Sequence, residues 1–227
     1  MTTLAERLSA IDDGIADAAR RAGRAREEIT LIAVTKFHPA SLVQDLYDLG
    51  VRHVGENRQQ ELSAKSAALS ALPDLRWHFI GQAQTKKASA IRRSAEVVHS
   101  VDRARLADAL DRVAVDDTLL DVLLQVNLTE DPERGGVPPA ELERLAEHVL
   151  SLPTLRLRGV MAVAPLDEDP AQAFARVYEY AVRLRALAPD ATWISAGMTA
   201  DYAEAVAAGA THLRIGSAIT GPRPAQG

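Results

Sequence analysis

The chain has 227 residues, with 26 lysines and arginines against 31 aspartates and glutamates, so its formal charge is −5. This mildly acidic balance gives no basic surplus that would indicate a nucleic-acid or membrane partner. The chain contains no cysteine, which excludes disulfides, thiolate metal sites and a cysteine nucleophile. We expect a cytoplasmic protein, because the N-terminus lacks the apolar core of a signal peptide and no apolar run is long enough to cross a bilayer.

The first predicted element is a helix over residues 1–22, in which leucine and isoleucine recur at helical spacing. Short apolar runs then alternate with longer segments of helical period. The expected strands are 31–35, 53–55, 77–80, 97–99, 121–126, 158–164, 192–195 and 211–215. The expected helices are 39–49, 57–69, 103–113, 139–150, 171–187 and 200–208, the last with Thr199 as its N-cap, and a further short helix follows the last strand.

Eight strands that alternate with helices predict an all-parallel sheet, and eight is the number that closes into a barrel. A doubly wound open sheet is the structural alternative, but it normally has a glycine-rich turn after its first strand. Here the first strand runs into Thr35-Lys36-Phe37-His38-Pro39, which contains no glycine. We therefore predict an α/β fold, a single (β/α)8 TIM barrel with an extra N-terminal helix. Residues 1–227 would form one domain, with 221–227 as a loose tail.

Lys36 directly follows the first predicted strand. Active sites of such barrels lie where the strands end, so its side chain is expected at the mouth of the barrel. Burial and neighbouring cations there would make a neutral amine available to form an imine. Most lysines are only solvated charges, so an exposed loop lysine is the simpler interpretation from spacing alone.

The turns after the last two strands give a stronger indication as a pair. Ser195-Ala196-Gly197-Met198-Thr199 follows strand seven, and Gly216-Ser217 follows strand eight. Backbone N–H groups at helix starts bind anions, and the phosphate site of many barrels lies after these same two strands. Tight turns that merely need glycine are the alternative.

Asn57 and His78 are also expected near this mouth, where a purely structural role is at least as plausible as ligand contact. Trp77 and Phe79 are expected in the core. The histidines show no metal-ligand spacing. A lysine facing a phosphate site leaves two chemistries open: a Schiff-base aldolase of a phosphorylated sugar, or bound pyridoxal phosphate.

Several blocks together resemble the pyridoxal-phosphate homeostasis proteins (the YggS/PROSC type) over nearly the whole chain. They are Ala33-Val34-Thr35-Lys36, Gly55-Glu56-Asn57 with Gln60-Glu61, Trp77-His78-Phe79-Ile80-Gly81, Gly159-Val160-Met161, Gly197-Met198-Thr199 with Asp201, and Arg214-Ile215-Gly216. The family is similar in fold to the N-terminal barrel of alanine racemase.

The resemblance implies a set of cofactor-binding residues. It places pyridoxal 5′-phosphate on Lys36, Asn57 beside it, and Arg214 against the pyridine nitrogen. The phosphate is expected on the turns after strands seven and eight. The implied binding residues are Lys36, Asn57, His78, Ser195, Met198, Thr199, Arg214, Gly216 and Ser217, with no catalytic and no metal-binding residue.

The same resemblance implies a protein that stores the cofactor in vitamin B6 homeostasis rather than one that turns over a substrate. An arginine beside the pyridine nitrogen disfavours protonation of the ring, which weakens the ring as an electron sink. Racemases of this fold add a tyrosine from a second domain, and we expect that domain to be absent here. The alternative is a pyridoxal-phosphate-dependent amino-acid racemase or lyase. PLP-dependent apo-enzymes are possible recipients, and we expect a monomer.

Overall fold

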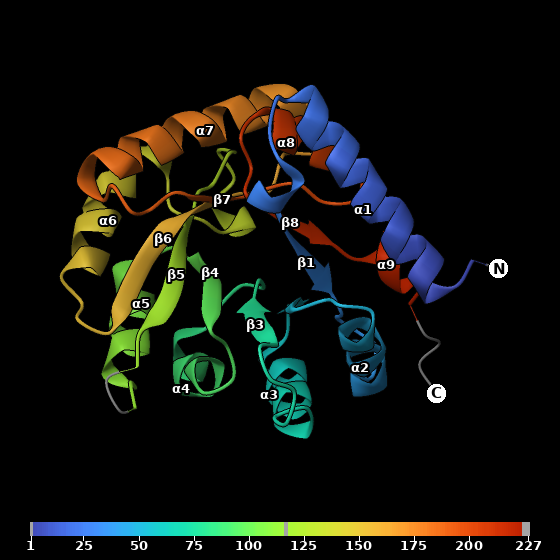
Figure 1. Ribbon diagram of the computed structural model, residues 1–227. Coiled ribbons are helices and arrows are strands. Elements are labelled where there is room, and N and C mark those ends of the chain that lie inside the picture. Colours follow the sequence, from blue (N-terminus) through green and yellow to red (C-terminus); the bar gives the residue numbers. More distant parts are fainter. Residues whose placement is uncertain (1, 116–117, 224–227) are drawn as a thin grey trace.

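The computed structural model describes residues 2–115 and 118–223. In this part of the chain, eight parallel strands close into a barrel in chain order, so that β8 pairs with β1. Figure 1 shows the strands as a ring with the helices outside it. The predicted (β/α)8 barrel is confirmed. The strands are β1 Thr30–Val34, β2 His53–Glu56, β3 Arg76–Phe79, β4 Val97–Val101, β5 Leu120–Gln125, β6 Leu155–Met161, β7 Trp193–Ser195 and β8 His212–Ile215.

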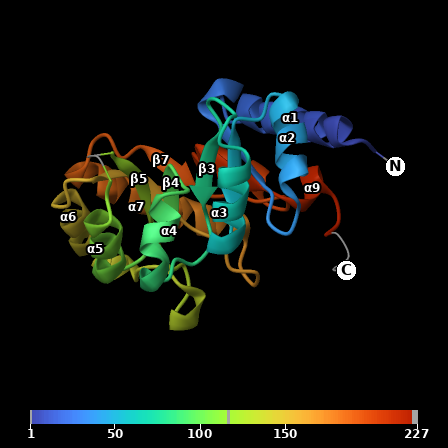
Figure 2. The same cartoon turned by 90° about the horizontal axis from the view of Figure 1, so that it is seen from below.

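The helices connect and cover these strands. They are α1 Leu4–Arg21, α2 Ala40–Asp48, α3 Gln59–Ala68, α4 Ala88–Arg92, α5 Ala104–Arg112, α6 Leu142–Leu150, α7 Pro170–Leu187, α8 Tyr202–Ala207 and α9 Ser217–Thr220. Figure 2 shows α3, α4 and α5 next to one another on one side of the barrel. The helix α4 is absent from our sequence prediction, because five residues are too few to show a helical period.

The main hydrophobic core lies between the barrel and its helices, and it includes Trp77 and Phe79 as predicted. A separate small cluster of Val97, Leu123 and Met161 lies apart from it, with Trp193 packed against it. Within the described residues, no helix combines the length and the apolarity that a membrane span requires.

The extra N-terminal helix α1 packs against α8 and α9 (Figure 1). Two arginines fix it there. Arg7 donates from Nε to the carbonyl of Ile219 over 2.7 Å. Arg24, just after α1, donates to the carbonyl of Val206 in the last turn of α8 and to that of Ala210, which follows the helix. Cationic donors at a helix end satisfy carbonyls that have no partner within the helix. The helix α1 is thereby joined to the elements that follow β7 and β8.

Candidate functional site

The predicted site residues follow four different strands. Lys36 lies in the turn after β1, and Asn57 directly after β2. Met198 follows β7, and Gly216 follows β8. Because all eight strands are parallel, their carboxyl ends lie at the same end of the barrel. The fold therefore gathers these residues at one mouth.

The backbone on both sides of Lys36 is held by buried and partly buried side chains. Before it, the hydroxyl of Thr35 donates to Glu56 Oε1 over 2.7 Å. Lys65 donates from Nζ to the carbonyl of Thr35 over 2.9 Å. After it, the N–H of Phe37 donates to Glu61 Oε2 over 2.7 Å. The half-buried side chain of Lys36 thus rises from a turn that is fixed at both ends.

The ion pair beneath this turn is almost completely buried. Lys65 Nζ lies 2.6 Å from Glu56 Oε1 and 3.4 Å from Glu61 Oε2. Burial raises the pKa of Glu56, although the bonds from Lys65 and Thr35 act in the opposite direction. Lys65 is not among the site residues predicted from the sequence, where its only signal is the neighbouring Gln60-Glu61 block.

Cations surround the aromatic ring of Phe37 at the mouth. The guanidinium carbon of Arg223 lies 4.0 Å from the ring centroid, that of Arg58 lies 5.0 Å away, and Lys36 Nζ lies 5.9 Å away. These distances are in the range of cation–π contacts. Arg223 belongs to the tail that we predicted to be loose. Its described part reaches Phe37, and residues 224–227 lie outside the described residues.

Asn57 provides an acceptor that has no partner. Its side-chain Oδ1 is buried, and no hydrogen bond reaches it in the described structure. A buried polar atom without a partner costs free energy, so natural structures usually satisfy it with protein, water or a ligand. This oxygen can accept a hydrogen bond from a ligand hydroxyl.

The turn after β7 is built around Gly197 and Asp201. Gly197 has a φ of +92°, and a Cβ there would lie 2.7 Å from the Cβ of Ala205. The N–H of Met198 donates to Asp201 Oδ1 over 2.6 Å. The helix α8 begins at Tyr202, so Asp201 occupies the N-cap position and our assignment of Thr199 as N-cap was wrong. Met198 and Thr199 are both exposed.

After β8 the chain passes through Gly216 into α9, which begins at Ser217. The short helix that we predicted at this point is confirmed. The first N–H groups of a helix have no partner within it. Ser217 is exposed and adds a hydroxyl at the same place. This end of the barrel therefore combines backbone donors with a hydroxyl, the kind of groups that bind phosphate.

Arg214 is buried and holds two polar groups together. Its Nη1 donates to Ser195 Oγ over 2.6 Å, and its Nη2 donates to the carbonyl of Ala162 over 2.9 Å. Burial lowers the pKa of Arg214 to about 10, and Asp201 opposes that shift. The guanidinium therefore stays cationic at neutral pH.

His78 and Ser195 lie inside the barrel, where neither side chain reaches solvent. Both ring nitrogens of His78 are engaged, with His53 over 2.9 Å and with His99 over 2.8 Å. Ser195 Oγ contacts His99 as well as Arg214. Direct ligand contact by either residue stays a prediction. Neither has a polar atom free of a protein partner in this arrangement.

Among the described residues, no three histidine, aspartate or glutamate side chains are arranged to hold a metal ion. The mouth instead combines an amine, a guanidinium, a free amide oxygen and backbone N–H donors. Such a set suits a ligand that carries an anionic group and a carbonyl able to react with an amine.

Comparison with known protein families gives a match over almost the entire chain. The model of the alanine racemase N-terminal domain matches residues 7–224. Two curated relatives carry the name pyridoxal phosphate homeostasis protein. The one from Mycobacterium tuberculosis is 41% identical, over 97% of this chain and 93% of its own length. The one from Escherichia coli K12 is 38% identical, over 98% of each chain.

A solved structure supports the same relationship. PipY of Synechococcus elongatus, determined with pyridoxal phosphate bound, is 38% identical and superposes with a TM-score of 0.81. The match covers 96% of this chain and 100% of that chain.

Proposed function

Since the chain belongs to the family of the pyridoxal phosphate homeostasis proteins, we propose that it holds pyridoxal 5′-phosphate as a Schiff base on Lys36 and contributes to intracellular vitamin B6 homeostasis. The observation that carries this proposal is the position of Lys36, half-buried at the carboxyl end of β1 in a turn fixed on both sides. When bound, the cofactor supplies an aldehyde that condenses reversibly with an amine and releases water.

The remaining residues at the mouth fit the other groups of this cofactor. Arg214 offers cationic N–H donors to a ring nitrogen that accepts. The free Oδ1 of Asn57 accepts from a hydroxyl. The N–H groups and hydroxyl at Gly216 and Ser217, with the exposed turn at Met198 and Thr199, serve the phosphate. His78 and Ser195 are the last two residues of the proposed binding set. Ser195 is hydrogen-bonded to Arg214, and His78 is joined to Ser195 through His99.

Catalytic turnover is not part of the proposed function. Arg214 is a cation and so disfavours a proton on the ring nitrogen. The tyrosines offer no second base at the mouth. Tyr47 donates to the carbonyl of Pro73, and the hydroxyl of Tyr202 lies against Gly14 of α1. Tyr178 and Tyr180 lie on the outer helix α7. Alongside storage, we propose a cytoplasmic monomer that acts as one domain and passes the cofactor to apo-enzymes that need it.

Borohydride reduction followed by peptide mass mapping tests the central assignment, because the chain has only four lysines: Lys36, Lys65, Lys86 and Lys87. We expect the reduced cofactor on Lys36 alone. Lys65 is the sharpest internal control, since it lies at the same turn but its amine is occupied by Glu56, Glu61 and a carbonyl. Label on Lys65, or an unlabelled protein after incubation with the cofactor, would overturn the proposal.

A second measurement separates storage from catalysis. The cofactor-loaded protein is incubated with a panel of amino acids in D₂O, and loss of the α-proton is followed by NMR. We expect no exchange above that of free cofactor. Exchange that disappears in Lys36→Arg but persists in Lys86→Arg would establish the racemase or lyase alternative.

A further inference from the structure

The interior of this barrel is unusually polar. Barrels of this kind are normally filled by layers of bulky apolar side chains. Here five strands, β2, β3, β4, β7 and β8, contribute polar residues that contact one another inside the ring. They are His53, His78, His99, Ser195 and Arg214.

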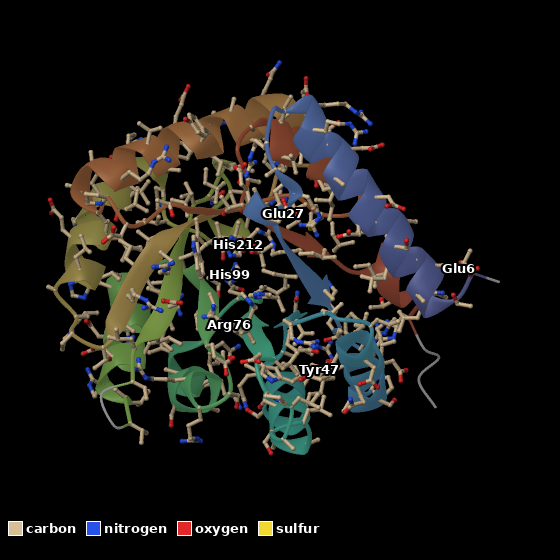
Figure 3. The ribbon with its side chains drawn as sticks, in the orientation of Figure 1. Glu6, Glu27, Tyr47, Arg76, His99 and His212 are labelled. Carbon is tan, nitrogen blue, oxygen red and sulfur yellow. The ribbon has the colours of Figure 1, made fainter. Side chains whose placement is uncertain are left out.

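These residues form one continuous hydrogen-bonded chain. His53 Nδ1 lies 2.9 Å from His78 Nε2. His78 Nδ1 lies 2.8 Å from His99 Nε2. His99 Nδ1 lies 2.9 Å from Ser195 Oγ, which accepts from Arg214 over 2.6 Å. Figure 3 shows His99 inside the ring of strands, near His212. We call this series the histidine chain.

The direction of the histidine chain follows from Arg214, which only donates. Ser195 Oγ therefore accepts from Arg214, and its single proton is left for His99 Nδ1. The opposite direction would leave a fully buried hydroxyl proton without a partner, which is costly. His99 then donates from Nε2 to His78, and His78 donates from Nε2 to His53. All three histidines are thus assigned the Nε2–H tautomer.

The surroundings favour neutral histidines, which such a chain requires. Burial lowers the pKa of His78 and of His99 well below the usual value. The neighbouring Arg76, Arg214 and His212 act in the same direction. A neutral imidazole has one donor and one acceptor nitrogen. A ring that accepts a hydrogen bond on one nitrogen therefore donates from the other, so all bonds along the chain run in the same direction.

The two ends of the histidine chain lie at opposite ends of the barrel. His53 is the first residue of β2 and lines a cavity of about 560 Å³ beside α1 and the starts of β1 and β2. Arg214 lies near the opposite end, because it donates to Ser195, the last residue of β7, and to the carbonyl of Ala162, which follows β6. The orientation of the guanidinium is therefore fixed through the interior of the barrel and not only from the mouth.

We propose that Ser195, His99 and His78 are positioning residues that hold Arg214 in one orientation through a directional hydrogen-bonded chain. One step rests on the proposed function, namely that the bound cofactor lies against Arg214. The direction of the histidine chain itself does not depend on the cofactor.

NMR of the wild-type protein tests the direction without any substitution. In cofactor-free protein labelled with ¹⁵N-histidine, long-range ¹H–¹⁵N correlations identify which ring nitrogen carries the proton. We expect His53, His78 and His99 to be neutral and protonated on Nε2 at pH 7. A proton on Nδ1 of His99 or His78, or a charged ring at either position, would overturn the proposal.

A pair of buried histidines tests the link to the cofactor. His99→Leu interrupts the histidine chain. His212→Leu removes another buried imidazole, which in the described structure stacks on Trp193, lies edge-on to His99 at 6.5 Å between ring centroids, and hydrogen-bonds Thr211 rather than a member of the histidine chain. We expect His99→Leu to raise the dissociation constant for pyridoxal 5′-phosphate about tenfold and to shift the absorption band of the bound cofactor. We expect His212→Leu to stay within about twofold of wild type.

The outcomes separate the two proposals. His99→Gln, which can accept and donate, should recover most of the affinity. Equal increases in the dissociation constant for His99→Leu and His212→Leu would mean that His99 contributes only packing, as any buried side chain does. That result would overturn the positioning role. If the wild type fails to bind the cofactor, the proposed function is wrong, and the NMR result alone tests the direction of the histidine chain. If His99→Leu does not fold, the NMR result on the wild type again provides the test.

Discussion

Lys65, a residue that is 6% exposed, places its ammonium group against two carboxylates and a carbonyl. Removing one partner of a buried ion pair leaves an uncompensated charge, so the effect of the loss exceeds the net value of the pair. We predict that Lys65→Met lowers the free energy of unfolding by about 3–5 kcal/mol at pH 8, as measured by urea denaturation. Lys86→Met, on an exposed side chain, should change it by less than about 0.5 kcal/mol.

The pH dependence of this variant identifies the charge responsible. Burial already raises the pKa of Glu56, and removal of Lys65 takes away the main cation that opposes the shift. A protonated Glu56 carries no charge, so the penalty is absent below the unfolded-state pKa of about 4.5, grows as the pH rises, and levels off above the raised folded-state pKa. The deficit of Lys65→Met should therefore be smaller at pH 5 than at pH 8. A deficit independent of pH would attribute the loss to packing instead.

For single residues, the rule that active sites of such barrels lie where strands end was sufficient to locate Lys36. A residue that directly follows a buried strand is placed by the strand itself. Lys65 could not be found in this way. Its role depends on α3 folding back over the turn after β1, which brings its Nζ to a carbonyl 30 positions earlier. Its sequence context is an unremarkable helix with little amphipathic pattern.

Among the elements, β6 and β7 approach so closely that only glycine fits at one position. Gly159 has a φ of +154°, and a Cβ there would lie 1.8 Å from the carbonyl oxygen of Trp193. We predict that Gly159→Ala lowers the free energy of unfolding by more than about 3 kcal/mol or prevents folding, because backbone must move in two paired strands.

Gly23→Ala is the matched control for Gly159→Ala. Gly23 also has a positive φ, +67°, but a Cβ there meets nothing within 4 Å. Its substitution should cost only the backbone strain, about 1 kcal/mol. Thermal unfolding of the two variants under identical conditions makes the comparison. Similar losses in both would show that the contact with Trp193 does not limit the pairing of β6 and β7.

Strand β6 also shows where sequence patterns fail at this scale. We predicted 158–164, and the strand is Leu155–Met161. Its first half alternates leucine with Arg156 and Arg158, and both arginines lie within 4 Å of Asp121, which is 2% exposed. Because of these two arginines, the first half of β6 resembles an exposed loop in the sequence, although it pairs beside a buried carboxylate. The apolar Ala162 and Ala164, buried after the strand, extended the run at the other end.

Over the whole molecule, periodicity and strand count were enough to predict the closed barrel, because parallel strands alternating with helices have few arrangements that bury both faces. The polar interior was not predictable from the same pattern. His78 and His99 occupy buried strand positions, and only closure of the ring brings them to Ser195, 96 positions after His99. Contacts across a barrel depend on strand tilt and register, which a local pattern does not contain.

The buried histidines should make the stability of the whole barrel depend on pH. Burial lowers the pKa of His53 to about 4 and that of His212 to about 3, and it lowers those of His78 and His99 strongly. An unfolded chain binds protons at these residues below about pH 6.5, whereas the folded chain does not until far lower pH. Stability is therefore complete above about pH 6.5 and is lost as the pH falls toward the folded-state values.

Removing one of these histidines should reduce that loss by a defined amount. Between pH 8 and pH 5, each buried histidine that stays neutral contributes about 2 kcal/mol to the decline in the free energy of unfolding. We predict that cofactor-free His212→Leu, compared with wild type by urea denaturation, declines about 2 kcal/mol less over this interval. Its stability at pH 8, where the imidazole is neutral in both states, measures the change in packing together with the lost hydrogen bond to Thr211. An equal decline in both proteins would mean that His212 takes up its proton while the barrel is still folded.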